Sequence, residues 1–225
     1  MVALKGPRIE PDGKPTGLVI FCHGYGSNGD DLIGVGRMWR ELLPGAVFVS
    51  PNAPEPVPGY PGGYQWFALD SVDRDPSALF WGAREAASLL DAFINAELDR
   101  YGLEDDRLAL VGFSQGTMMA LHVGLRRMEA CAGILGYSGL LPDDGRLEQA
   151  ITAKPPVFLI HGAADDRIPA QASEVAAQTL EKLGVPTRLH ISPGVPHSIG
   201  QDGLELGGRF LAEVLAAKAQ SPQNR

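Results

Sequence analysis

The chain has 225 residues, a length that suits one α/β domain able to bury a large core without a disulfide or metal to hold it together. Its formal charge of −8 argues against nucleic acid or an anionic membrane surface as the main partner. No apolar run approaches the roughly 18 residues that a membrane-spanning helix needs, and the N-terminus does not resemble a signal peptide.

Residues 2–15 predict only an edge strand or hairpin. Beyond them, short apolar runs predict buried strands, and amphipathic segments between the runs predict helices. Strands are expected at 18–22, 46–50, 108–111, 132–137, 157–160 and 187–191, and helices at 31–42, 77–101, 117–125, within 139–153, at 171–183 and at 203–219. This alternation predicts a single α/β domain over 1–219, with a mostly parallel central sheet and helices on both faces. The polar residues 220–225 are expected to be a disordered tail.

Single residues refine this outline. Asp30 is the expected cap of the first helix, and Gly102 is the expected C-terminal stop of the helix over 77–101. The two cysteines, Cys22 and Cys131, both lie in apolar strand-like runs. We therefore expect two buried free thiols and a reducing, cytoplasmic location.

Residues 51–76 form a long stretch rich in proline and glycine, which predicts irregular structure. It carries four aromatic residues, Tyr60, Tyr64, Trp66 and Phe67. So many aromatic residues argue against disorder, and a loop of this length in a compact domain is usually functional. Two interpretations stay open: the aromatic side chains form one wall of a ligand pocket, or they pin the loop to the body of the protein.

The most informative motif is Gly112-Phe113-Ser114-Gln115-Gly116, between a predicted strand and a predicted helix. A serine in this setting, with glycine two positions on either side, is typical of the nucleophile elbow of α/β-hydrolases. The strained turn holds the serine hydroxyl clear of the sheet edge, and the glycines let strand and helix pass closely. The alternative is a tight turn that merely requires small residues.

An acid and a base are expected at other strand ends, in the chain order Ser…Asp…His. Of the five histidines, only His197 lies in a loop after the last predicted strand, free to reach inward and act as the base. His23 and His161 each precede a glycine at a strand end and are expected to brace their loops. Asp165 is favoured as the acid, with the adjacent Asp166 left open.

Two backbone N–H groups should stabilise the oxyanion of the reaction. One is expected from Gln115, directly after the nucleophile, and the other from the loop His23-Gly24-Tyr25-Gly26, from Tyr25. No Gly-Lys-Ser/Thr follows this loop, so a phosphate-binding loop is disfavoured. No histidine–carboxylate spacing is convincing for a metal, and we expect neither a metal nor an organic cofactor.

Taken together, these motifs resemble the phospholipase/carboxylesterase family of α/β-hydrolases, which includes the acyl-protein thioesterases. The resemblance covers about residues 15–215 and is carried by His23-Gly24-Tyr25-Gly26, Trp66-Phe67, Gly112-Phe113-Ser114-Gln115-Gly116, Gly162-x-x-Asp165-x-x-Ile168-Pro169 and Pro196-His197. It implies an α/β-hydrolase fold, a Ser114–Asp165–His197 triad, and oxyanion donors at Tyr25 and Gln115. The chain departs from common family patterns at Tyr25, where leucine is frequent, and at Ala68, where aspartate is frequent.

The expected function is a serine carboxylesterase that cleaves short- to medium-chain esters through an acyl-enzyme intermediate. Lysophospholipids and acyl thioesters are the alternative substrates, and a non-catalytic binding module is the alternative from another class. The expected substrate contacts are Trp66, Phe67, Tyr64 and Met118. The expected partner is a small-molecule ester, with neither nucleic acid nor stable membrane insertion, and both a monomer and a homodimer remain open.

Overall fold

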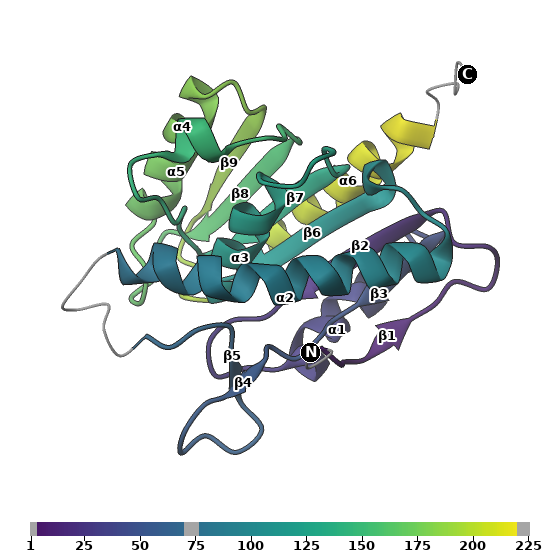
Figure 1. Ribbon diagram of the computed structural model, residues 1–225, viewed down its shortest axis with the longest axis horizontal. Coiled ribbons are helices and arrows are strands. Elements are labelled where there is room, and N and C mark those ends of the chain that lie inside the picture. The colour runs from purple at the N-terminus through teal and green to yellow at the C-terminus, as the bar shows by residue number, and fades with distance from the viewer. Residues whose placement is uncertain (1–3, 70–76, 220–225) are drawn as a thin grey trace.

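The computed structural model describes residues 4–69 and 77–219, and they are built around one seven-stranded sheet (Figure 1). The strand order is β1-β3-β2-β6-β7-β8-β9. The strands are β1 (Arg8–Ile9), β2 (Gly17–Cys22), β3 (Ala46–Val49), β6 (Leu108–Phe113), β7 (Gly133–Tyr137), β8 (Val157–Gly162) and β9 (Thr187–Ser192). Only β1, at one edge, pairs antiparallel; all the other neighbours are parallel, as the sequence predicts.

Helices cover both faces of the sheet. They are α1 (Gly29–Trp39), α2 (Ala78–Tyr101), α3 (Gln115–Gly124), α4 (Leu147–Ala150), α5 (Gln171–Lys182) and α6 (Gln201–Ala219), with a 3₁₀ turn at Asp105–Arg107 before β6. One buried cluster joins the sheet to α1 and α6, and the other joins it to α2, α3 and α5. The protein is thus a three-layer α/β structure of the α/β-hydrolase type.

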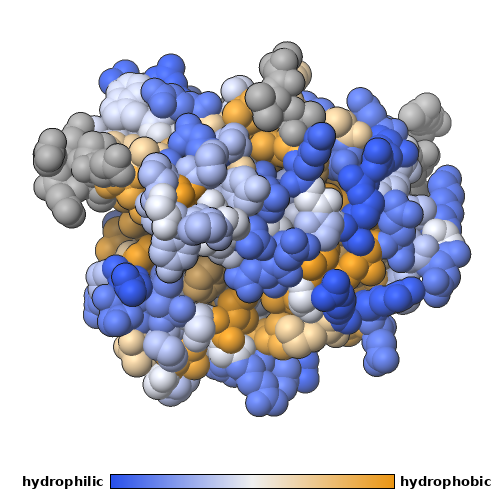
Figure 2. Space-filling view, turned by 90° about the horizontal axis from the view of Figure 1, so that it is seen from below, coloured by the Kyte–Doolittle hydropathy of each residue, from blue (hydrophilic) through white to orange (hydrophobic). Residues whose placement is uncertain are grey.

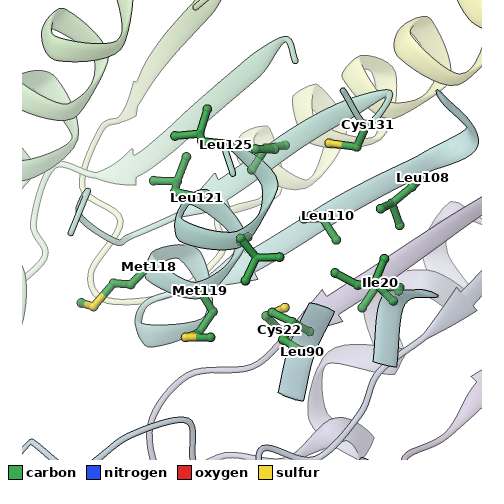
Figure 3. Close-up of a cluster of buried hydrophobic side chains, with 14 of the residues drawn as sticks. Ile20, Cys22, Leu90, Leu108, Leu110, Met118, Met119, Leu121, Leu125 and Cys131 are labelled. Carbon is green, nitrogen blue, oxygen red and sulfur yellow. The ribbon is translucent and has the colours of Figure 1, made fainter. Parts of the chain in front are cut away.

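The central strands are apolar on both faces because both faces are covered. In β2, for example, Ile20 and Cys22 face α2 and α3, whereas Val19 and Phe21 face α1 and α6. Figure 3 shows part of the cluster on the side of α2, α3 and α5, in which Leu90 and Met119 pack over the sheet. This continuous packing fixes the position of α3, and therefore of the residue that precedes it.

Several local predictions are confirmed. The N-terminal segment contributes the edge strand β1, and Gly102 ends α2 in the left-handed conformation, with φ of 62°. Cys22 and Cys131 are buried free thiols, and burial raises the pKa of each to about 12. One prediction is wrong: Asn28, not Asp30, caps α1, because its side-chain oxygen lies 3.2 Å from the N–H of Asp31, which donates to it.

The proline-rich stretch is less irregular than expected. It contains a two-stranded ribbon, β4 (Glu55–Pro56) and β5 (Tyr64–Gln65), which projects at the lower left of Figure 1. Proline is tolerated in such a ribbon because an edge position does not require its missing N–H. Residues 70–76 of the predicted loop, and the predicted tail over 220–225, lie outside the described residues.

Hydrophilic residues cover much of the face seen in Figure 2, and hydrophobic residues show in patches between them. Within residues 4–69 and 77–219, none of the helices combines the length and the apolar character needed to cross a lipid bilayer.

Candidate active site

Ser114 stands at a strained turn between β6 and α3. Its backbone has φ of 54° and ψ of −116°, in the positive-φ range that residues with side chains rarely adopt. A Cβ atom on Gly112 would lie 2.4 Å from the carbonyl oxygen of Gly116, and one on Gly116 would lie 1.8 Å from the carbonyl oxygen of Cys22. Both glycines are therefore required for strand and helix to pass so closely, and this is the geometry that the elbow motif predicts.

The structure brings the predicted acid and base together. Nδ1 of His197 lies 2.7 Å from Oδ2 of Asp165, and the Asp165 side chain is fully buried. The other oxygen, Oδ1, accepts hydrogen bonds from the backbone N–H groups of Arg167 and Ile168, each at 2.9 Å. Burial alone would raise the pKa of the Asp165 carboxyl, but these N–H groups and the His197 ring together lower it. Asp166, by contrast, is exposed at the cleft described below.

The remaining histidines have other surroundings. The His23 ring is hydrogen-bonded to Gly24 O and to the N–H of Ala53, so it braces its loop as expected. His122 is buried in α3, where burial and nearby Arg126 and Arg84 lower its pKa to about 4. The ring of His190 is hydrogen-bonded to Asp202.

The loop after β2 lies directly against the elbow. A Cβ atom on Gly24 would lie 3.4 Å from the Cβ of Ser114, so the backbone of this loop passes beside the serine. Gln115 is the first residue of α3, where helix geometry leaves the N–H without an upstream carbonyl partner. Tyr25 and Gln115 both line the same cleft as Ser114. The two predicted oxyanion donors thus flank the nucleophile.

A cleft of about 1520 Å³ opens over Ser114 and His197, both of which line it. Its apolar lining residues include Leu69, Leu79, Met118, Leu140 and Ile168, and its polar ones include Ser27, Asn28, Asp31 and Arg167. Met118 and Tyr60 therefore lie where a substrate contact is expected. Among the described residues, no hydrogen bond joins Ser114 Oγ to His197.

Three predicted pocket residues, Trp66, Phe67 and Tyr64, are not among the residues that line this cleft. Trp66 and Phe67 are buried in the core, and the indole N–H of Trp66 donates to His23 O at 2.9 Å. The Gln115 side chain accepts from the N–H of Trp66 and donates to Phe67 O. The geometry thus favours the second interpretation, in which these aromatic residues pin the loop.

Tyr64, in the same proline-rich segment, also holds the loop after β2, which carries Tyr25. The N–H of Gly26 donates to Tyr64 O at 2.9 Å, and the N–H of Tyr64 donates to Ser27 O at 2.8 Å. Residues 64–67 are therefore a brace for both the elbow and the loop beside it. The sequence pattern alone is compatible with aromatic residues that line a pocket and with aromatic residues that anchor the loop, so it does not predict this role.

Comparison with known proteins agrees with this geometry. The family model described as Phospholipase/Carboxylesterase matches residues 7–215. The chain belongs to the phospholipase/carboxylesterase family. It is 32% identical over 181 residues to acyl-protein thioesterase 1 of Schizosaccharomyces pombe (76% of this chain, 79% of that protein) and 28% identical over 243 residues to the Neurospora crassa protein of the same name (100% and 98%). The crystal structure of esterase PE8 superposes with a TM-score of 0.91 at 46% identity, covering 95% of this chain and 100% of that one.

Sequence reasoning missed several residues of this site. Leu69, Leu79 and Leu140 line the cleft, but no local pattern distinguishes them from apolar residues that pack in the core. The sequence predicts that His161 braces its own loop, but the ring also lies 3.2 Å from the Asp165 carboxylate. The spacing of four residues between them is a signal that was available. Within the part of the chain that the structure describes, no three His, Cys, Asp or Glu side chains are grouped so as to hold a metal ion.

Proposed function

We propose that the protein is a serine carboxylesterase in which Ser114, His197 and Asp165 act as the catalytic triad. The observation that carries this proposal is the 2.7 Å contact between His197 Nδ1 and the buried Asp165 carboxylate, at a cleft that the strained Ser114 also lines. The carboxylate can only accept, so Nδ1 carries the hydrogen and Nε2 is left with its lone pair.

In the proposed reaction, Ser114 Oγ attacks the substrate carbonyl carbon while Nε2 of His197 takes the hydroxyl proton. The proton then passes to the leaving alcohol, which departs as the acyl-enzyme forms. Water attacks this intermediate by the same route and releases the acid. A hydrogen bond between Ser114 and His197 is expected to form as substrate binds, because such bonds are often long in the free enzyme.

The tetrahedral intermediate carries its negative charge on the former carbonyl oxygen. The backbone N–H groups of Gln115 and Tyr25 are the proposed donors to this oxygen. Their support is the close approach of Gly24 to Ser114 and the place of Gln115 at the start of α3. The positive end of the α3 dipole adds to this stabilisation.

The proposed substrates are esters with short to medium acyl chains. The cleft exceeds the roughly 300–1,000 Å³ of ordinary small-molecule sites, and its apolar members, Met118, Leu79 and Ile168 among them, suit an alkyl chain. Acyl thioesters and lysophospholipids are the second candidates, since the acyl-protein thioesterases are relatives over most of the chain. The two buried free thiols favour a reducing cytoplasm as the place of action.

A fluorophosphonate probe tests the chemistry. It should label the wild-type protein and leave Ser114→Ala unlabelled, and Ser114→Ala should lower kcat by several orders of magnitude. A folded wild-type protein that resists labelling would favour the non-catalytic binding module instead. A series of p-nitrophenyl esters of increasing chain length, run beside an acyl-CoA thioester and a lysophospholipid, then assigns the substrate class.

A further inference from the structure

His161 contacts the acid of the proposed triad within the protein interior. It stands near the end of β8, and its side chain is fully buried. Nε2 lies 3.2 Å from Oδ2 of Asp165, and at 2.9 Å from Ile168 O it is within hydrogen-bonding distance of that carbonyl. The imidazole thus contacts both ends of the turn from Asp165 to Ile168. The catalytic steps above do not use this ring.

The contacts of Asp165 show what the His161 ring adds to the support of the carboxylate. Oδ1 is held by two backbone N–H groups, from Arg167 and Ile168. Oδ2 meets two histidines: His197, on a loop and one-fifth exposed, and His161, on the rigid sheet. Because Nε2 of His161 also lies 2.9 Å from the Ile168 carbonyl, it contacts the turn that supplies both Oδ1 donors. The carboxylate thus has one contact from the sheet in addition to those from its own turn and from the loop that carries the base.

The hydrogen positions on His161 follow from its neighbours. Nε2 faces two oxygens that can only accept, Ile168 O and the Asp165 carboxylate, so it carries a hydrogen. In the neutral ring Nδ1 is then an acceptor, and Ser173 Oγ, at 2.7 Å, is the group that donates to it. The two acceptor oxygens at Nε2 therefore select the tautomer that points an N–H toward the acid, and the hydroxyl of Ser173, buried on α5, accommodates it because it can donate as well as accept.

Ser173 also reaches the nucleophile side of the site. Its hydroxyl lies 3.3 Å from Gly139 O, in the loop after β7. Gly139 packs closely on the elbow: a Cβ atom there would lie 2.4 Å from the Cβ of Thr117 and 3.0 Å from Ser114 O. A continuous set of buried contacts therefore runs from the acid, through His161 and Ser173, to the turn beside the nucleophile.

We propose that His161 and Ser173 are positioning residues, which hold the Asp165 carboxylate in the orientation that receives Nδ1–H of His197. This inference rests on the proposed function, but it concerns only the orientation of the Asp165 carboxylate. Neither residue touches the substrate, since neither lines the cleft within the described residues.

Two substitutions of His161 separate positioning from packing. In His161→Gln the side-chain amide can occupy the place of Nε2 and still donate toward Ile168 O and Asp165. In His161→Asn the amide reaches only the place of Nδ1, so the contact with Ser173 survives and the contact with the acid is lost. We expect kcat to fall about 10- to 100-fold in His161→Asn, and no more than about threefold in His161→Gln, with KM little changed in both.

Thermal unfolding is the control for stability, because both variants remove the same buried ring. If the two lose activity equally, or in proportion to their loss of Tm, His161 is a packing residue and the proposal is wrong. Ser173→Ala keeps the ring and removes only the hydroxyl. It should lower kcat by about three- to tenfold, less than His161→Asn. Full activity in His161→Asn would equally overturn the proposal.

The proton on Nδ1 of His197 gives a readout that does not require turnover. In the wild-type protein this hydrogen, shared with a buried carboxylate, should give a low-field proton NMR signal. The signal should persist in His161→Gln and shift or broaden in His161→Asn; an identical signal in all three proteins refutes the positioning role. Failure of the wild-type protein to label or turn over would instead refute the proposed function, whatever the NMR shows.

Discussion

Trp66 provides a sharp test of how the structure holds its active site together. Trp66 is 1% exposed, its indole N–H donates to His23 O at 2.9 Å, and its backbone N–H donates to the Gln115 side chain. If Trp66 anchors its loop to the core, Trp66→Ala should lower the stability of the fold more than it changes substrate preference. If it were a pocket wall, the same change would alter chain-length preference and leave folding intact.

The magnitude follows from what the substitution removes. Replacing a buried tryptophan with alanine costs about 3–5 kcal/mol in lost burial and cavity formation. The carbonyl of His23, in a residue with no exposed surface, also loses its indole donor, which adds about 1–3 kcal/mol. The total of about 4–8 kcal/mol is comparable to the whole stability of many domains, so Trp66→Ala should be largely unfolded. Trp66→Phe keeps most of the ring and should lose only about 1–3 kcal/mol.

Urea unfolding of Trp66→Phe, with the midpoint and slope fitted together, measures this loss. Tyr60→Ala is the matched comparison, because Tyr60 lines the cleft and is 65% exposed. It should change stability by no more than about 0.5 kcal/mol and raise KM for the longer esters. The reasoning fails if Trp66→Phe unfolds at the wild-type urea concentration while its kcat/KM falls only for the longer esters.

Two further predictions concern the elbow and the acid. Gly116→Ala should destabilise the protein by about 3 kcal/mol or more and abolish fluorophosphonate labelling, because its Cβ would lie 1.8 Å from Cys22 O. Gly34→Ala, in α1 with no atom near the new Cβ, should instead stabilise by about 0.5–1 kcal/mol in the same urea assay; equal losses would contradict the argument. The depressed pKa of Asp165 means that the stability it contributes is present above about pH 4 and is lost as the pH falls through its lower folded value. Asp165→Asn should therefore weaken the acid dependence of the unfolding free energy, and an unchanged dependence would exclude this contribution.

The order of strands and helices could be predicted because it depends on local patterns. The central strands have apolar side chains on both faces, and α2 repeats its apolar residues at helical spacing over its 24 residues. The cap of α1 was harder to predict, since Asn28 and Asp30 are both good capping residues. The choice between them depends on backbone geometry, which a spacing pattern does not contain.

The roles of the aromatic residues could not be predicted for a related reason. Tyr60, Trp66 and Phe67 lie within eight positions of one another, yet the first is largely exposed and the other two are buried. The difference arises from partners distant in the chain, such as the Gln115 side chain and the His23 carbonyl. Proximity in the sequence carries no information about such partners.

By itself, the sequence determined the chemistry that this protein can perform. The elbow, the Ser…Asp…His order and the glycines are local features, because strain and close approach act over a few residues. Only the tertiary structure decided which aromatic residues are buried in the core and which line the cleft, and that His161 lies 3.2 Å from the Asp165 carboxylate. These outcomes depend on contacts between strand ends that lie far apart along the chain, and the packing of the sheet alone brings those ends together.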